Sequence, residues 1–423
     1  MWKKLLSIWY LPDLRNKILF VLAMLVIFRI AAVIPIPGVD TANLKSFFQD
    51  SQLFGLLNIF SGGGLERFSI VAMGVAPYIT ASIIFQLLVM IVPKLEALQK
   101  EGEYGRQKIN QYTRYLTVPL AVIQGYGLIA LLRQSPKPVL GDLDMLSMVL
   151  MILTLTAGTV FLMWIGELIS EKKVGNGISL LIFAGIIAGV PAALRTFEVL
   201  DQSQIFNLLT FIIIGLITIV FVVIMTEGQR NIPVTYARRV RGMSMGSVDT
   251  HLPIRVSQAG VIPIIFAISV ILFPPTIAQF FVNVKTQFVA DGAHAVIAFF
   301  NDTTAYGVFY FILVIAFTYF YTSVIFKPDQ ISENLQKQGG FIPGIRPGKS
   351  TSEFLQETVN KIIFPGALFL GIIAVLPLVV QEFTGITSLA VGGTSLLIVV
   401  SVAIETFKQI EAQLTARDYE EFL

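Results

Sequence analysis

Long apolar runs separated by polar segments dominate the chain. Ten of these runs approach the roughly 20 residues that an α-helix needs to cross a bilayer. They cover residues 18–34, 75–92, 116–132, 148–169, 178–194, 208–226, 259–280, 306–326, 362–380 and 392–407. The alternation typical of β-strands is absent, except that the longest loops have room for short hairpins. The pattern predicts an all-α, polytopic membrane protein with ten transmembrane helices.

Composition agrees with this prediction and limits the kinds of chemical site that the chain can contain. Of the 423 residues, 55% are hydrophobic and only 13% are charged, whereas soluble domains carry about 25% charged residues. Little of the chain remains for a soluble domain. The absence of cysteine excludes disulfides and thiolate metal sites. The only histidines, His251 and His294, are far apart in polar stretches, so a metal site or a proton-relay pair is not expected.

The distribution of basic residues predicts the orientation in the membrane. If the N-terminus is cytoplasmic, the inner segments hold 23 of the 30 lysines and arginines and the outer segments hold 5. This asymmetry places both termini in the cytoplasm. The basic N-terminus resembles a signal peptide, but the many later spans favour an uncleaved first helix.

The stretch from residue 61 to 88 is not an ordinary span. Three consecutive glycines at 62–64 permit a chain reversal. We expect a short helix over residues 65–73, interrupted by Gly74 and Pro77, that covers about half of the bilayer core. Backbone groups freed at such a break need partners other than lipid, so the break should line a cavity. A kinked span with a turn at the membrane surface is the alternative.

Two segments echo each other along the chain. Residues 74–81 and 260–267 share the pattern G-V-x-P-x-I-x-A and open the second and seventh apolar runs. Five runs separate them, which suggests two halves, residues 1–200 and 201–423. An odd number of spans in each half gives the halves opposite topology, as in an inverted repeat.

The chain carries no recognisable catalytic set. A Walker A loop, a nucleophile elbow and an HExxH motif are all missing from the sequence. We therefore expect a protein that is not an enzyme and that uses no cofactor or metal. Ion-coupled transporters usually bury acids or histidines at mid-membrane, but here the acids lie near the ends of the runs. Arg29 alone lies well inside a run, where it needs an ion-pair partner or must extend toward water.

Aliphatic pairs and long polar loops allow two interpretations each. Val75 and Ile79 share a helix face, as do Ile178 and Ile182; these four residues are typical of an ordinary core as well as of a pore.

The inner loops 227–258 and 327–361 are longer than simple connections. Their basic residues either fix the topology or bind an acidic protein surface or RNA phosphates.

Several motifs together resemble one known family over nearly the whole length. They are IPIPG (34–38), GGLERFSI (63–70), PYITASII (77–84), EGEYGR (101–106), GNGIS (175–179), YARR (236–239), GVIP (260–263), PGIRPG (343–348) and GGTSLLI (392–398). In this order they resemble the SecY family, which forms the centre of the bacterial Sec protein-conducting channel. The resemblance implies an hourglass of two inverted five-helix halves in the bacterial inner membrane, which passes signal-bearing polypeptides and releases hydrophobic segments sideways into lipid.

The resemblance also implies roles for individual residues. The pore ring would consist of Val75, Ile79, Ile178, Ile182, Ile265 and Ile398. A plug over residues 62–73 would close it, with the plug and hinge residues Gly62, Gly63, Gly64, Arg67, Phe68 and Gly74. The lateral gate, between the second and third and the seventh and eighth spans, would include Thr80, Ser82 and Gln86.

Partners follow from the same resemblance. Arg238, Arg239 and Arg346 match positions that engage the SecA ATPase and the ribosome. SecE-like and SecG-like small subunits and membrane lipids are the other expected partners. After Arg241 the chain reads GMSMG where relatives carry further basic residues, which predicts a weaker hold on RNA. An ion- or solute-coupled secondary transporter and a non-conducting insertase remain the alternatives.

Overall fold

The described part of the structure, a computed structural model, is built mainly of α-helices. It comprises residues 11–39, 43–44, 58, 61–133, 139, 144–197, 205–236, 248–258, 260–282, 284, 286–384 and 387–421. The helices are α2 (Pro12–Val33), α5 (Ala76–Ile91), α6 (Pro93–Lys100), α7 (Glu103–Arg133), α8 (Met145–Glu171), α9 (Gly177–Phe197), α10 (Ile205–Glu227), α11 (Ile262–Phe281), α12 (Gln287–Asn301), α13 (Thr303–Ile325), α14 (Pro328–Lys337), α15 (Lys349–Thr384) and α16 (Thr387–Glu421).

Several helices have the length and composition of membrane spans. Among the described residues, five regions qualify: Pro12–Val33, Glu103–Arg133, Met145–Glu171, Thr303–Lys337 and Lys349–Val380. Helices α5 and α6 would add a sixth span, bent by 99° between them. Shorter apolar stretches lie in α9, α10 and α11. The chain is therefore a multi-pass membrane protein, as predicted, and the count of ten spans stays a prediction.

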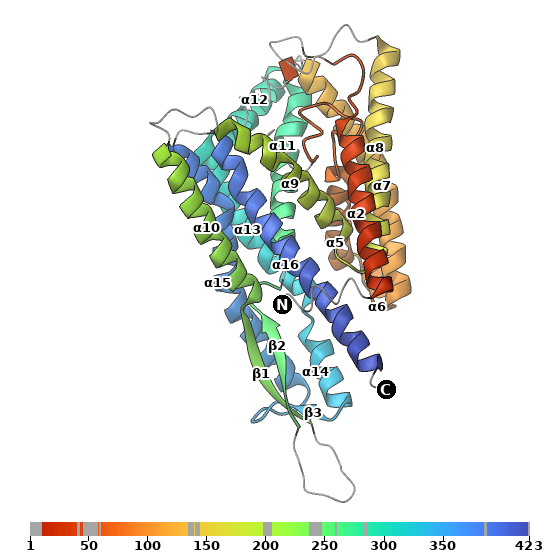
Figure 1. The fold of residues 1–423 in the computed structure, drawn as a ribbon, viewed down its shortest axis with the longest axis vertical. Helices are drawn as coiled ribbons and strands as arrows, with labels where there is room; N and C mark the ends of the chain where they lie inside the picture. The colour runs from red at the N-terminus through yellow and green to blue at the C-terminus, as the bar shows by residue number, and fades with distance from the viewer. Residues whose placement is uncertain are drawn as a thin grey trace, which may run out of the picture.

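Two groups of helices meet along a central pair of helices, α9 and α16. Helices α2, α7 and α8 lie on one side of the molecule, and α10, α13 and α15 lie on the other (Figure 1). Helix α9 packs against α2 and α8, whereas α16 packs against α10 and α15, and α9 and α16 contact each other. A second contact between the groups runs from α5 and α7 to α11.

Helix α8 is capped at its start, and two of its glycines let it pack closely against its neighbours. The Asp144 carboxylate caps this helix by accepting a hydrogen bond from the Met145 backbone N–H, at 2.8 Å. A Cβ added at Gly158 would lie 1.9 Å from the Ile70 carbonyl oxygen. A Cβ at Gly166 would lie 2.6 Å from a methyl carbon of Ile178. Glycines at these positions therefore let α8 contact both the segment before α5 and the start of α9.

A small antiparallel sheet joins the two long polar loops. Strands β1 (Gln229–Tyr236) and β2 (Val248–Arg255) form a hairpin, and β1 also pairs with β3 (Gly340–Phe341). The hairpin, β3 and α14 extend from the end of the molecule opposite α12 (Figure 1). Ile232, Val234 and Leu355 belong to one hydrophobic cluster there. The sequence pattern left room for a hairpin in the long loops, but it did not predict that the two loops pair with each other.

Several helices differ from the predicted pattern. Helices α6, α12 and α14 lie in segments predicted as loops. Helices α7 and α15 begin at Glu103 and Lys349, well before residues 116 and 362, and α16 continues to Glu421, beyond residue 407. In α14, Ser332 and Leu335 are buried three positions apart, the spacing of one helix face. This spacing of Ser332 and Leu335 is the feature of the sequence that could have indicated a helix at α14.

Candidate functional site

Residues 61–75, before α5, form a succession of tight turns instead of the predicted half helix, and we call them the turn segment. Each of the bonds Gly64 N to Ser61 O, Phe68 N to Leu65 O and Ala72 N to Ser69 O spans three residues. Phe68 has a positive φ of 47°, and Gly74 has one of 57°. These left-handed conformations interrupt a continuous helix. The prediction of a helix over residues 65–73 is therefore wrong, although the segment is compact and buried.

A backbone bridge explains this departure from helix. The Ile36 N–H donates to the Phe68 carbonyl at 2.9 Å, and the Ile70 N–H donates to the Ile34 carbonyl at 3.0 Å. These bonds pair Pro35 with Ser69 in an antiparallel bridge. Residues 68–70 thus bond to the segment that follows α2 and cannot bond within a helix at the same time.

Local hydrogen bonds fold the first turns of this segment. Asn58 accepts from the Gly63 N–H through its carbonyl oxygen at 2.8 Å and from the Glu66 N–H through its side chain at 3.0 Å. The Ser61 hydroxyl accepts from the Leu65 N–H at 2.9 Å. Leu65, Phe68 and Ala72 of this segment then enter one hydrophobic cluster with residues of α7 and α8. The sequence interpretation missed Asn58 and Ser61, although both are typical side-chain partners of turns.

The six aliphatic residues expected at a pore ring come from four helices. Val75 and Ile79 lie at the start of α5, Ile178 and Ile182 on α9, Ile265 on α11 and Ile398 on α16. Five of them are buried members of one continuous hydrophobic cluster, and Ile178 is partly buried against that cluster. Val71 of the turn segment belongs to the same cluster. The fold therefore gathers these positions, far apart in sequence, into one apolar centre.

The expected lateral gate would run between α5 and α7 on one side and α11 and α13 on the other, and α11 contacts both α5 and α7. Its polar residues bond within α5 itself. The Thr80 hydroxyl donates to the Ala76 carbonyl at 3.0 Å, and the Gln86 amide donates to the Ser82 hydroxyl at 3.1 Å. The Gln86 carbonyl oxygen is buried without a hydrogen-bond partner in the described structure. The hydrogen bonds of Thr80, Ser82 and Gln86 in the described structure therefore do not join the two sides of the contact.

The expected partner-binding arginines are only partly placed. Arg346 is exposed on the turn between β3 and α15. Its carbonyl accepts from the Thr351 hydroxyl at 2.9 Å, and the Ser332 hydroxyl donates to the nearby Gly348 carbonyl at 2.6 Å. Hydroxyl groups of α14 and α15 therefore hold the backbone of the turn, while the Arg346 side chain is exposed. Arg238 and Arg239 lie outside the described residues.

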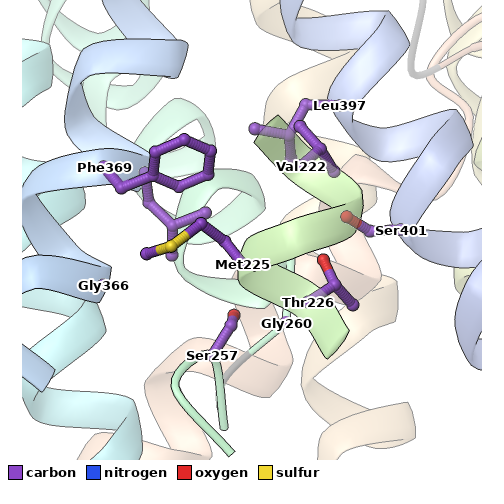
Figure 2. A pocket seen from close by; sticks show the side chains of 10 residues that line it. Val222, Met225, Thr226, Ser257, Gly260, Gly366, Phe369, Leu397 and Ser401 are labelled. Carbon is purple, nitrogen blue, oxygen red and sulfur yellow. The ribbon is translucent and has the colours of Figure 1, made fainter. Parts of the chain in front are cut away.

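A crevice lies where α10 meets the segment between β2 and α11 and the helices α15 and α16 (Figure 2). Its lining mixes apolar side chains with hydroxyls and contains no charged residue. The lining residues are Val222, Met225, Thr226, Ser257, Gly260, Gly366, Phe369, Leu370, Leu397 and Ser401. The described part of the chain contains no group of three or more acidic or histidine side chains suited to a metal ion.

Comparison with known sequences identifies the family. A family model described as SecY matches residues 69–407. The chain belongs to the SecY family. The protein translocase subunit SecY of Streptomyces galbus is 43% identical over 97% of both chains. The SecY subunit of Halalkalibacterium halodurans is 43% identical and aligns over the full length of both chains.

Solved structures show that the SecY fold extends over the chain. A chain from "The structure of a protein conducting channel" aligns with a TM-score of 0.63 at 17% identity, covering 94% of this chain and 91% of that chain. A chain from "Sec61 in the Canine ribosome-channel complex from the endoplasmic reticulum" has a TM-score of 0.58 at 16% identity, with the same coverage. At these identities the similarity establishes the fold alone.

Proposed function

We propose that this chain is a protein-translocation channel that passes signal-bearing polypeptides across a membrane and releases hydrophobic segments sideways into lipid. The supporting observation is the buried apolar cluster that includes Val75, Ile182, Ile265 and Ile398, together with Val71 of the turn segment. Helices from both predicted halves contribute to it. Membership of the SecY family agrees with this function.

The apolar centre suits transport of a chain better than transport of an ion. Aliphatic side chains cannot replace the hydration shell of an ion, so ion entry is unfavourable. The same side chains move between rotamers and can contact any passing residue without binding it specifically. Residues 62–73 would act as the plug that closes the centre at rest, and the contact of α11 with α5 and α7 would open as the lateral gate.

Partners and location belong to the same proposal. We place the chain in the bacterial inner membrane. Both termini would lie in the cytoplasm, because the lysines and arginines concentrate in the segments on the same side as the N-terminus. SecE-like and SecG-like subunits would accompany it, and the SecA ATPase or the ribosome would drive transport. The solved relative described as part of a canine ribosome-channel complex supports the ribosome.

Reconstitution tests this function directly. The purified chain, its small partner subunits and SecA are placed in vesicles with a signal-bearing precursor. Protease-protected precursor should accumulate with ATP and should be absent without the signal. Vesicles that import no precursor would contradict the proposal. Solute uptake driven by a sodium or proton gradient without precursor would instead favour a secondary transporter.

Arg346→Glu should reduce SecA-driven transport several-fold while leaving the protein folded. The side chain is exposed, and the turn is held by the hydrogen bond that the Thr351 hydroxyl donates to the Arg346 carbonyl, which the substitution keeps. Reversal of the charge removes a contact to an acidic or phosphate surface. Import rates and protein abundance are measured together, with Lys349→Glu as the control at an exposed residue at the start of α15. Lower abundance at an unchanged specific rate would show that the loop is only structural.

A further inference from the structure

Arg29 contacts the turn segment from within the first apolar helix. It lies on α2, four residues before the helix ends, and its side chain is partly buried. Its Nη1 donates a hydrogen bond to the Gly62 carbonyl at 2.5 Å. A charged side chain at this depth needs a polar partner. The sequence suggested an ion pair or an extended, water-facing side chain, whereas the structure supplies a backbone carbonyl.

Packing around Gly62 fixes the position of that carbonyl. Gly62 has a φ of 66°, and an added Cβ would lie 2.6 Å from the ring of Phe28 and 3.1 Å from the Cα of Gly185. The Phe28 ring is buried, and the Arg29 guanidinium lies 5.9 Å from its centroid. Two consecutive residues of α2 therefore contact Gly62, one through packing and one through a charge-assisted hydrogen bond.

Two hydrogen-bonded attachments hold the turn segment to α2 and to the residues after it, one at the beginning of the segment and one in its middle. Gly62 at its beginning bonds to α2, and residues 68–70 bond to residues 34–36, which follow α2. The backbone bridge uses groups that any sequence supplies. The bond at Gly62 depends on one side chain, because the donor is the guanidinium of Arg29. It is therefore the attachment that a substitution can remove selectively.

We propose that Arg29 is a positioning residue that holds the first turn of the plug against α2 and keeps the resting channel closed. This inference rests on the proposed function, because it gives residues 62–73 the role of a plug. Release of Gly62 leaves the plug held by the backbone bridge at residues 68–70 and by apolar packing, without a side-chain hydrogen bond to α2. The resting channel then opens more often, whereas the open channel, which no longer involves this bond, conducts as before.

The first test is the resting conductance of the purified complex in planar bilayers without precursor. Arg29→Met keeps an unbranched apolar stem but removes the guanidinium and its donors. The frequency of opening should rise about tenfold, the scale expected for loss of one charge-assisted hydrogen bond. The conductance of each opening should stay unchanged. Arg15→Met is the matched control, because Arg15 is exposed on the same helix, and it should open as rarely as the unmodified chain.

A second arm separates release of the plug from general damage. A Pro35→Cys and Ser69→Cys pair, placed at the bridge, is added to Arg29→Met and oxidised. A restored resting closure supports the proposal, since the disulfide locks the attachment that remains at the bridge and compensates for the bond lost at Gly62. A leak that persists after oxidation, or an opening frequency equal to that of the unmodified chain, overturns it. If Arg29→Met does not assemble, Arg29→Gln is scored by the same two outcomes.

The proposed function and this inference fail in different ways. If the chain is not a translocation channel, unmodified vesicles import no precursor in the reconstitution described above. If only the inference is wrong, import by the unmodified chain is normal and Arg29→Met does not change the resting conductance. Size-exclusion profiles of each variant confirm that the compared complexes are assembled.

Discussion

Oxidation of a Pro35→Cys and Ser69→Cys pair in the otherwise unmodified chain should reduce precursor import to background. The two residues form an antiparallel bridge, flanked by backbone bonds of 2.9 and 3.0 Å. Opposed residues in this arrangement have Cα atoms about 4.5 Å apart, within the range that a disulfide spans. A closed disulfide would keep the plug beside the end of α2. The absence of native cysteine makes the pair unambiguous.

The measurement is import of precursor before and after addition of a reductant. Import should return when the disulfide is reduced, and each single cysteine variant should import normally under both conditions. Ser69 is suited to the change, because its buried hydroxyl has no hydrogen-bond partner in the described structure. Normal import with a fully formed disulfide would show that residues 68–70 need not leave this position, and would contradict the role of plug.

The second large effect concerns the apolar centre. Ile398→Asn and Ile265→Asn should each raise resting ion conductance about tenfold, which corresponds to a barrier lower by about 1.4 kcal/mol. Both side chains are at least 95% buried, with exposures of 1% and 5%. An amide at either position brings hydrogen-bonding groups, and therefore water, to a surface that an ion otherwise cannot enter. Import of precursors with defective signals should rise as well.

Ile398→Leu is the matched control, because it keeps the volume and the apolar character of the side chain. Its conductance and signal dependence should equal those of the unmodified chain. Thermal stability is measured for every variant, since a buried amide without partners costs about 1–3 kcal/mol. Unchanged conductance in both asparagine variants would contradict the assignment of these residues to a pore ring.

The long apolar elements were predictable from sequence because their signals are local. Residues 148–169 were predicted as a span, and α8 covers Met145–Glu171. The extra turn at its start follows from the Asp144 cap. The motifs also identified the family, which the family model confirms over residues 69–407. The functional residues on these helices were located by motif, and their roles stay predictions.

The turn segment was mispredicted because its structure depends on distant residues. The apolar pattern of residues 65–73 favours a helix, but the backbone groups of Phe68 and Ile70 bond to residues 34–36. Such a tertiary contact outweighs the modest helix propensity of the segment. Pairing of Tyr236 with Gly340 is equally non-local, so no window of sequence contains it. Helix α12 is different, since Ala293 and Phe300 are buried seven residues apart, a spacing that indicates one helix face.

The continuity of α15 has a mechanical consequence. Its 36 residues extend about 54 Å at 1.5 Å per residue, well beyond the hydrocarbon thickness of about 30 Å. Its first turns pack against α14, and its later turns pack against α13. A load applied to the β1–β2 hairpin, which shares a hydrophobic cluster with the start of α15, would pass along this continuous helix to α13, with Pro365 and Pro377 as the positions where the helix can bend. Force generated outside the membrane would therefore reach its interior through one helix, with no loop in between.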